Sequence, residues 1–216
     1  CKKNDLMSKR DIRRKFGQNY LSDPAIIFEM GQAIGPYSKD KFLEVGPGMG
    51  ALTKTLNQKD IKILAIEVDK DNIDYLSKNF QGPAEFQFIN DDILKTSLDF
   101  LEAGAFRIVG NLPYNISTQI ILRFIHWSKY IQDMHFLVQK EVAEKITGTI
   151  KTKNWGKLSI KIAAFFNTEI LFDVPPESFD IKPKVMSSFI RMAPKQNLEF
   201  DSNLVTNLYK VIDLSF

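Results

Sequence analysis

The chain alternates short apolar runs with segments in which apolar residues recur every three or four positions. Apolar runs bounded by polar or turn residues predict strands, and the three-to-four spacing predicts helices. Regular alternation of the two up to about residue 150 predicts a mostly parallel, doubly wound α/β sheet. The predicted strands span 41–45, 61–66, 86–90, 107–109 and 134–138, and the predicted helices between them span 50–57, 71–79, 118–129 and 140–147.

An earlier helix has sequence signals at both ends. Asp23 can cap its N-terminus, Pro24 fits its first turn, and Gly35 followed by Pro36 ends it. The segment before it, 16–21 (FGQNYL), is too irregular for a strand and too apolar for a plain linker.

The last third of the chain departs from this alternation. Residues 160–172 and 185–192 are strand-like, and a proline-rich segment separates them. They predict an antiparallel hairpin at the sheet edge, which makes the expected sheet seven-stranded. A helical pattern begins near residue 201. We therefore expect one α/β domain over residues 1–195 and the incomplete start of a small helical domain over residues 196–216.

Composition narrows the class of protein. A chain of 216 residues can hold one α/β domain with a small appendage. Its 44% hydrophobic and 25% charged residues, without any long apolar run, predict a soluble protein with no membrane span. The single cysteine, Cys1, excludes a disulfide framework and a cysteine metal site. Because His126 and His135 lack ligand spacing, we expect no metal centre.

Positive charge is concentrated at the N-terminus. The first fifteen residues hold seven Lys or Arg and two Asp, whereas the whole chain carries a net charge of only +3. A basic block ahead of the fold is typical of proteins that bind a phosphate backbone. Arg13, Arg14 and Lys15 are therefore candidate nucleic-acid contacts, and a solvated tail is the alternative.

The segment Asn111-Leu112-Pro113-Tyr114 follows a predicted strand, at the sheet edge where α/β proteins bind ligands. The Asn111 side-chain carbonyl and the Leu112 backbone carbonyl can both accept hydrogen bonds from one exocyclic amine. Pro113 holds Leu112 extended, and Tyr114 offers a flat face for a planar base. The tetrad predicts a clamp for a flipped nucleobase that carries an amino group, and a strand-ending turn is the alternative.

A glycine-rich loop follows the strand predicted at 41–45. Gly46 and Gly48 let a ligand approach the backbone. Pro47 lacks the N–H that a pyrophosphate cradle uses, and Ala51 stands where the dinucleotide motif requires its third glycine. A ligand without phosphates fits better, and S-adenosyl-L-methionine is such a ligand.

Acids follow the next strands at the same sheet edge. Glu67 lies 21 residues after Gly46, where an acid can accept hydrogen bonds from both ribose hydroxyls. After the strand predicted at 86–90 comes the pair Asp91-Asp92, where a carboxylate can accept from an adenine amino group. Acids often end strands, but their succession at one edge supports a nucleoside site.

On these motifs, the chain resembles the KsgA/RsmA family of ribosomal RNA adenine dimethyltransferases, from residue 16 to about residue 194. The segment 16–21 is similar to the family's opening motif and 111–117 (NLPYNIS) to its catalytic loop. The chain departs from the family pattern in the segment 180–182, which is less proline-rich than the corresponding segment of the family. The remaining matching segments are 44–48, 133–136, 139–143 and 183–185 together with Ser187.

The resemblance implies a Rossmann-like, class I S-adenosylmethionine-dependent methyltransferase domain over residues 1–195. It implies a substrate as well: the N6 atoms of two adjacent adenosines in a hairpin near the 3′ end of 16S rRNA of the small ribosomal subunit. The resemblance also implies that the protein is a cytoplasmic monomer with a role in ribosome biogenesis. The implied contacts are Gln18, Asn19 and Leu21 over the cofactor, Gly46 and Gly48 at its methionine part, Glu67 at its ribose, Asp92 at its adenine, Asn111 at cofactor and target, and Phe179 facing the target base.

Three other functions compete with this interpretation. A 23S rRNA adenine methyltransferase resembles the chain, but such proteins favour Ile in place of Leu112 and lack the Gly-Pro-Gly form of the loop. A non-catalytic RNA- or DNA-binding relative is disfavoured by the intact tetrad at Asn111. A nicotinamide dehydrogenase is disfavoured by Pro47 and Ala51.

Overall fold

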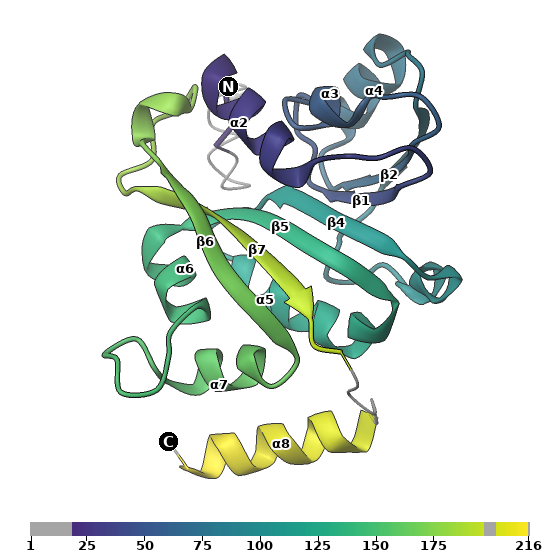
Figure 1. Ribbon diagram of the computed structural model, residues 1–216. Helices are drawn as coiled ribbons and strands as arrows, with labels where there is room; N and C mark the ends of the chain where they lie inside the picture. The colour runs from purple at the N-terminus through teal and green to yellow at the C-terminus, as the bar shows by residue number, and fades with distance from the viewer. Residues whose placement is uncertain (1–18, 197–201, 216) are drawn as a thin grey trace, which may run out of the picture.

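The computed structural model describes residues 19–196 and 202–215, and its strands form one sheet in the order β3-β2-β1-β4-β5-β7-β6 (Figure 1). Five strands pair in parallel, and β7 runs antiparallel to both β5 and β6. The predicted seven-stranded sheet with a C-terminal antiparallel hairpin is thereby confirmed. The strands are β1 (Lys41–Val45), β2 (Lys62–Glu67), β3 (Glu85–Asn90), β4 (Phe106–Asn111), β5 (Ile131–Gln139), β6 (Phe166–Val174) and β7 (Ser187–Pro194).

Helices cover both faces of the sheet. Apolar side chains of α2 and α3 pack in one core, and those of η1, α5, η2, α6 and α7 pack in the other. The helices are α2 (Pro24–Ile34), α3 (Thr53–Leu56), α4 (Lys70–Asn79), α5 (Ser117–Arg123), α6 (Lys140–Ile146), α7 (Lys157–Ala163) and α8 (Ser202–Ser215), with 3-10 turns η1 (Asp99–Ala103), η2 (Phe124–Tyr130) and η3 (Pro176–Ser178).

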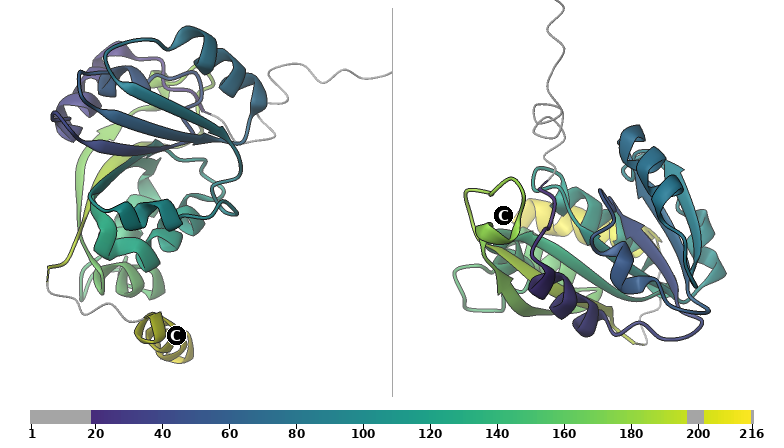
Figure 2. Two further views of the ribbon diagram at one scale, coloured as in Figure 1. Left: turned by 90° about the vertical axis from the view of Figure 1, so that its right-hand side faces the viewer. Right: turned by 90° about the horizontal axis from the view of Figure 1, so that it is seen from above.

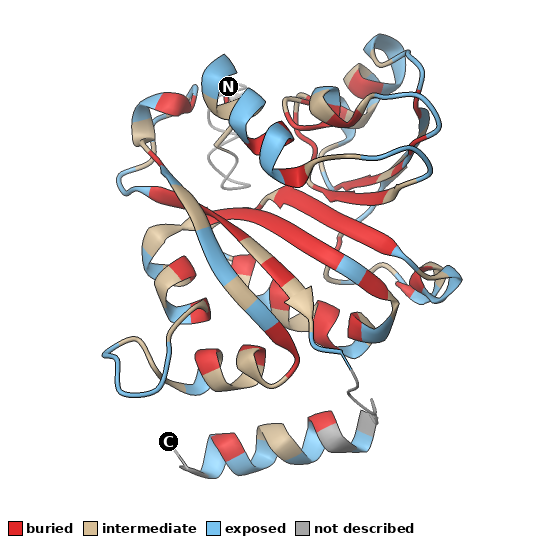
Figure 3. Cartoon of the chain, viewed as in Figure 1, coloured by how far each residue is buried: buried red, intermediate tan, exposed pale blue. Residues whose placement is uncertain are grey.

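The central strands are buried on both faces, as Figure 3 shows for β4 and β5. In β1, Phe42 packs under α2 and α3, whereas Leu43 and Val45 enter the core on the opposite face. Successive side chains of a strand point to opposite faces, so a doubly covered strand must be apolar at nearly every position. This is why the continuous apolar runs in the sequence located the strands.

Helix α2 begins and ends where its sequence signals placed it. The Asp23 carboxylate accepts hydrogen bonds from the backbone N–H groups of Ala25, at 2.9 Å, and Ile26, at 3.4 Å. Gly35 takes the left-handed conformation, with φ of 54°, and its N–H donates to the Gly31 carbonyl. Both caps are therefore confirmed.

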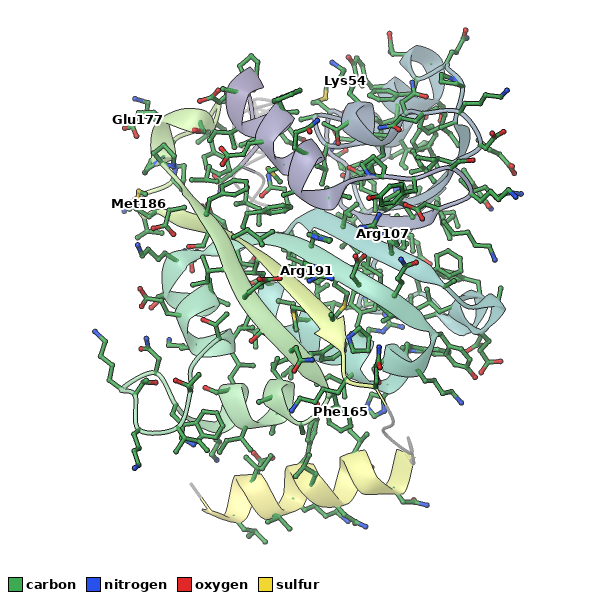
Figure 4. The ribbon with its side chains drawn as sticks, in the orientation of Figure 1. Lys54, Arg107, Phe165, Glu177, Met186 and Arg191 are labelled. Carbon is green, nitrogen blue, oxygen red and sulfur yellow. The ribbon has the colours of Figure 1, made fainter. Side chains whose placement is uncertain are left out.

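A buried arginine fastens the end of α2 to the sheet (Figure 4). Arg107 of β4 donates to the backbone carbonyl of Ile34 at 2.6 Å and pairs with Asp133 of β5 at 2.8 Å. It also pairs with Asp40, at 2.8 Å. Removing the Arg107 guanidinium would leave buried acids and helix carbonyls without partners, which costs several kcal/mol in such networks. The network fixes the position of α2 relative to the sheet. It thereby also fixes where the chain enters α2.

Two predicted helices differ in length from the structure. The helix predicted over 50–57 is helical only at Thr53–Leu56, because the glycine-rich loop continues as a turn. The helix predicted over 118–129 is split into α5 and the 3-10 turn η2.

The strand predicted over 160–172 was wrong at its beginning. Residues Lys157–Ala163 form helix α7, and β6 begins only at Phe166. Ile160 and Ile162 alternate with polar residues as they would in a strand. Leu158 and Ile162, however, are four residues apart and pack on the same core, which is the spacing of a helix. The Ser159 hydroxyl also accepts from the Gly156 N–H at 3.2 Å, which caps the start of the helix.

Helix α8 lies against α7 at the far end of the molecule (Figures 1 and 2). Val205 and Ile212 are buried, and Lys161 of α7 pairs with Asp213 at 3.0 Å. The predicted start of a second domain at residue 196 stays a prediction. Within the described ranges 19–196 and 202–215, no helix has both the length and the apolar character needed to cross a membrane.

Candidate active site

A cavity of about 350 Å³ opens where the strand order reverses, between the carboxyl ends of β1 and β4. This is the position at which open α/β sheets bind ligands. Five stretches of chain contribute to its lining, which explains why no single motif describes it. They lie within residues 19–21, 44–52, 66–68, 91–94 and 111–116, and the single residues Met30 and Ile120 complete the lining.

Close backbone approach brings the tetrad at Asn111 to the glycine-rich loop. A Cβ atom on Gly110 would lie 2.7 Å from the Val45 carbonyl oxygen, so only glycine allows β4 to run this close to β1. Gly48 has φ of +56°, and a Cβ there would lie 2.7 Å from the Tyr20 ring. These two glycines let Asn111, the loop and the segment around Tyr20 meet around one cavity.

Glu67 is a buried acid that is held by the loop it faces. Its carboxylate accepts from the Gly48 N–H at 3.0 Å and from the Asp69 N–H at 2.9 Å. Burial raises the pKa of Glu67, and these two amide contacts oppose the rise. Glu67 lines the cavity, and its predicted contact with the ribose stays a prediction.

Glu44 is a cavity acid that the sequence interpretation treated only as part of the loop motif. Its side chain is 1% exposed, and its Oε2 atom has no hydrogen-bond partner among the described residues. Burial raises the pKa of Glu44 to about 7, and the nearby Glu67 adds to the rise, while Thr53 opposes it. A single acid in the otherwise apolar end of a strand was the signal that could have revealed it.

Asp92 lies in a tight turn that borders the cavity. Its carboxylate accepts from the Leu94 N–H at 2.9 Å, and its carbonyl accepts from the Thr96 N–H at 2.9 Å. Arg123 of α5 donates to the backbone carbonyls of Ile93 and Thr96, and these two hydrogen bonds hold the turn in place. The sequence did not single out Arg123, because its partners are backbone atoms about thirty residues away.

The Asn111 side chain is oriented by the segment that crosses the cavity. Its Nδ2 atom donates to the Asn19 backbone carbonyl at 2.7 Å. A carbonyl can only accept, so the nitrogen must face Asn19 and the Oδ1 atom must face away from it. Asn111 lines the cavity, and its amide oxygen is therefore available as an acceptor beside it.

The other residues of the tetrad occupy different surroundings. Leu112 is buried, and its N–H donates to the Leu137 carbonyl at 3.1 Å, whereas Pro113 lines the cavity. Tyr114 lies outside the cavity lining, with its hydroxyl 2.5 Å from that of Ser187. Burial raises the pKa of Tyr114, so the phenol stays protonated.

Most of the predicted contacts gather around the cavity, but some do not. Those that line it are Asn19, Leu21, Gly46, Gly48, Glu67, Asp92, Asn111, Leu112 and Pro113. Gln18, Arg13, Arg14 and Lys15 lie outside the described residues, so their contacts stay predictions.

Phe179 is buried rather than open to the cavity. It is 3% exposed and forms a β-bridge with Leu21, which is itself buried. Stacking on a target base would require this buried ring to become accessible, and the stacking role stays a prediction. Phe179→Leu, which retains most of the core volume, is a cleaner test than truncation to Ala.

The fold and the cavity together define a class I methyltransferase: a doubly wound sheet with one antiparallel strand next to the edge, and a glycine-rich loop at its switch point. Within this class, the chain belongs to the ribosomal RNA adenine dimethylase family, whose model matches residues 9–216.

Curated relatives agree with this assignment. Ribosomal RNA small subunit methyltransferase A of Legionella pneumophila (strain Corby) is 42% identical over 205 residues, covering 94% of this chain and 79% of the relative. The protein of the same name from Neisseria meningitidis serogroup B is 36% identical over 210 residues, covering 97% of this chain and 80% of the relative.

Solved structures share the fold. A dimethyladenosine transferase from Plasmodium falciparum superposes with a TM-score of 0.74 at 25% identity, over 91% of this chain and 70% of that one. The 23S rRNA methyltransferase ErmE superposes with a TM-score of 0.72 at 24% identity, over 91% of this chain and 78% of that one. The likeness to ErmE shows the fold alone.

Proposed function

We propose that this chain transfers methyl groups from S-adenosylmethionine to the N6 atoms of two adjacent adenosines in the 3′-terminal hairpin of 16S rRNA. The observation that carries the proposal is the Asn111 amide, whose nitrogen is engaged by Asn19 and whose oxygen is left as an acceptor beside the cavity. The names of the relatives, which specify small-subunit ribosomal RNA, support this choice of RNA.

The cavity residues suit S-adenosylmethionine. Gly46 leaves open space beside the loop, since a Cβ there would meet nothing within 4 Å, and Pro47 removes a phosphate donor. Glu44 offers an unpartnered buried oxygen, which suits the ammonium group at the amino-acid end of this molecule. Glu67 and Asp92 supply acceptors for the ribose hydroxyls and the adenine amine. The residues present therefore fit the group.

Asn111 and Leu112 prepare the adenine amine for reaction. Adenine N6 is a weak nucleophile, because its lone pair is delocalised into the ring. In the first transfer, the Asn111 Oδ1 atom and the Leu112 carbonyl oxygen would each accept one N6 hydrogen, which turns the lone pair out of conjugation. In the second transfer, one of these oxygens would accept the single hydrogen that remains on N6. Bound S-adenosylmethionine supplies an electrophilic methyl group on a sulfonium. Alignment and fixed dipoles then account for most of the rate, and no general base is needed because the methylated ammonium is very acidic.

Aromatic stacking would hold the target base outside its RNA loop. Extrusion of a base costs a few kcal/mol, whereas stacking on one aromatic ring stabilises it by about 1–3 kcal/mol. One ring can fall short of this cost, so two rings are expected. Tyr114 is the first, and Phe179, once its buried ring becomes accessible, is the second.

The test uses undermethylated small ribosomal subunits and bare large-subunit RNA, each incubated with the full chain and labelled S-adenosylmethionine. We expect N6,N6-dimethyladenosine only in the small subunits, at two neighbouring positions. Asn111→Ala serves as the matched control and should incorporate label about 10²–10³-fold more slowly. Label in large-subunit RNA, or monomethylation that never proceeds to dimethylation, would contradict the proposal.

A further inference from the structure

One hydrogen bond outside the cavity ties the catalytic loop to strand β7. The hydroxyl oxygens of Tyr114 and Ser187 are 2.5 Å apart, although 73 residues separate them in the sequence. Ser187 is fully buried, whereas Tyr114 is only half-buried. The far end of the phenol is therefore anchored inside the protein while part of the ring remains accessible.

Ser187 is a fixed point of the sheet. It is the first residue of β7, and β7 runs between two other strands. Its register partners are Gln139 in β5 and Val174 in β6. Pairing on both sides leaves the backbone of Ser187 little freedom, and complete burial of its side chain restricts where the hydroxyl can lie.

The neighbours of Ser187 are fastened as well. The carbonyl of Met186, labelled in Figure 4 where the chain enters β7, accepts from the Lys140 N–H at 3.0 Å. The Ser188 hydroxyl donates to Asp173 at 2.6 Å, and Asp173 in turn pairs with the Lys140 ammonium at 2.5 Å. The position of Ser187 is thus set by contacts on either side of it that do not involve Tyr114.

The geometry of a phenol decides what this bond controls. The hydroxyl oxygen of Tyr114 lies at the far end of the axis about which the ring turns, so a bond to it fixes where this axis lies and leaves the ring only rotation about the axis. A stacking surface must present its face at one position to hold a base near the Asn111 amide. Misplacement of about 1 Å in such an arrangement can cost on the order of 10²-fold in rate.

We propose that Ser187 is a positioning residue that holds the Tyr114 ring where the extruded adenine stacks on it. The inference rests on the proposed function, because it assigns Tyr114 to the target base. It adds that the end of β7, a strand with no residue in the cavity lining, takes part in selecting the target. The bond also explains why residue 114 is tyrosine and not phenylalanine, because phenylalanine has no hydroxyl that could bond Ser187.

A double-mutant cycle tests this positioning role. Ser187→Ala and Tyr114→Phe each remove one hydroxyl of the pair and retain the ring. Each should lower kcat/KM for RNA by about threefold to tenfold, the value of one buried hydrogen bond expressed as a rate ratio. The double variant should lose no more than either single variant, because the same bond is lost in all three.

Two further measurements separate positioning from general damage to the fold. The dissociation constant for S-adenosylhomocysteine should stay unchanged in both single variants, because neither residue lines the cavity. Ser159→Ala is the matched control, because this buried serine of α7 bonds the backbone carbonyls of Lys145 and Asn154 instead of Tyr114 and should leave kcat/KM for RNA unchanged. If Ser187→Ala fails to fold, Tyr114→Phe still reports on the same bond from its accessible side.

The outcomes are distinguishable from failure of the proposed function. If the wild-type chain does not methylate small-subunit RNA, the proposed function fails before any variant is compared. If the wild type is active but the losses of Ser187→Ala and Tyr114→Phe multiply in the double variant, the positioning role is wrong and the function stands. An equal loss of affinity for S-adenosylhomocysteine would also overturn the positioning role.

Discussion

The cofactor side of the cavity, at the ends of β1 to β3, differs from the target side around Tyr114 in how its polar groups are paired. On the cofactor side, Glu44 has a buried oxygen without a partner among the described residues. On the target side, Tyr114 is already bonded to Ser187. Under the proposed function, the first arrangement gains a hydrogen bond when a ligand arrives, whereas the second holds a ring ready before the RNA arrives. Asn111 stands between the two.

The largest effect should come from Asn111, where the two sides meet. Asn111→Ala removes the amide oxygen that would accept an N6 hydrogen, so we expect turnover to fall about 10²–10³-fold, as for loss of one preorganised polar group elsewhere. Binding of RNA should change little. Single-turnover methylation and an RNA-binding titration measure the two quantities, and near-normal turnover would contradict the mechanism.

Asn111→Asp sharpens the same comparison. It retains an acceptor oxygen but replaces the Nδ2 donor with a second oxygen, which would face the Asn19 carbonyl and be repelled by it. We expect this variant to be nearly as inactive as Asn111→Ala. Activity close to that of the wild type would show that the contact to Asn19 does not orient the amide.

The next largest effect concerns the buried acid of the cofactor side. The pKa of Glu44 is raised from 4.5 to about 7 in the folded protein, so between these pH values the folded chain keeps a proton that the unfolded chain has lost. Stability of the cofactor-free protein therefore falls as pH rises through this window, by on the order of 3 kcal/mol from this group. Glu44→Gln should remove that part of the fall.

Urea denaturation at pH 5 and pH 8 measures this difference. Without cofactor, Glu44→Gln should be more stable than the wild type at pH 8 and close to it at pH 5. With S-adenosylhomocysteine present, the order at pH 8 should reverse, because the variant loses the carboxylate proposed to pair with the ligand ammonium. Equal pH dependence in the two proteins would mean that Glu44 carries no raised pKa.

The smallest effect should come from the turn at Asp92. Arg123→Met removes the donors to the Ile93 and Thr96 carbonyls, so the turn becomes less fixed. We expect KM for S-adenosylmethionine to rise about tenfold with little change in kcat, since ordering of a binding loop affects mainly affinity. Arg191→Met, on the exposed pair with Glu169, is the control and should leave KM unchanged. A fall in kcat alone would place Arg123 on the target side instead.

Local sequence signals were sufficient for much of the fold. The strand predicted at 41–45 coincides with β1, and the caps of α2 at Asp23 and Gly35 were found at the predicted residues. These features depend on backbone propensity and on burial of both sheet faces, which neighbouring residues encode. The beginning of β6 was misplaced because Ile160 and Ile162 satisfy the strand period as well as the helix period.

The positions of the site residues were predictable where these residues lie at the ends of parallel strands. Gly46, Glu67, Asp92 and Asn111 follow strands at one sheet edge, so the parallel order alone brings them together. The contact of Asn19 with Asn111 spans 92 residues. It could not be predicted, because it depends on how the chain before α2 crosses the cavity.

The most direct test of this account is a crystal structure of the chain with S-adenosylhomocysteine and an undermethylated small-subunit hairpin RNA. We predict that one adenine is extruded, with N6 within hydrogen-bonding distance of the Asn111 Oδ1 atom and the Leu112 carbonyl oxygen. Its ring should lie on Tyr114, with the bonds to Ser187 and Asn19 intact. An adenine bound elsewhere, or an Asn111 amide turned so that its nitrogen faces N6, would contradict the account.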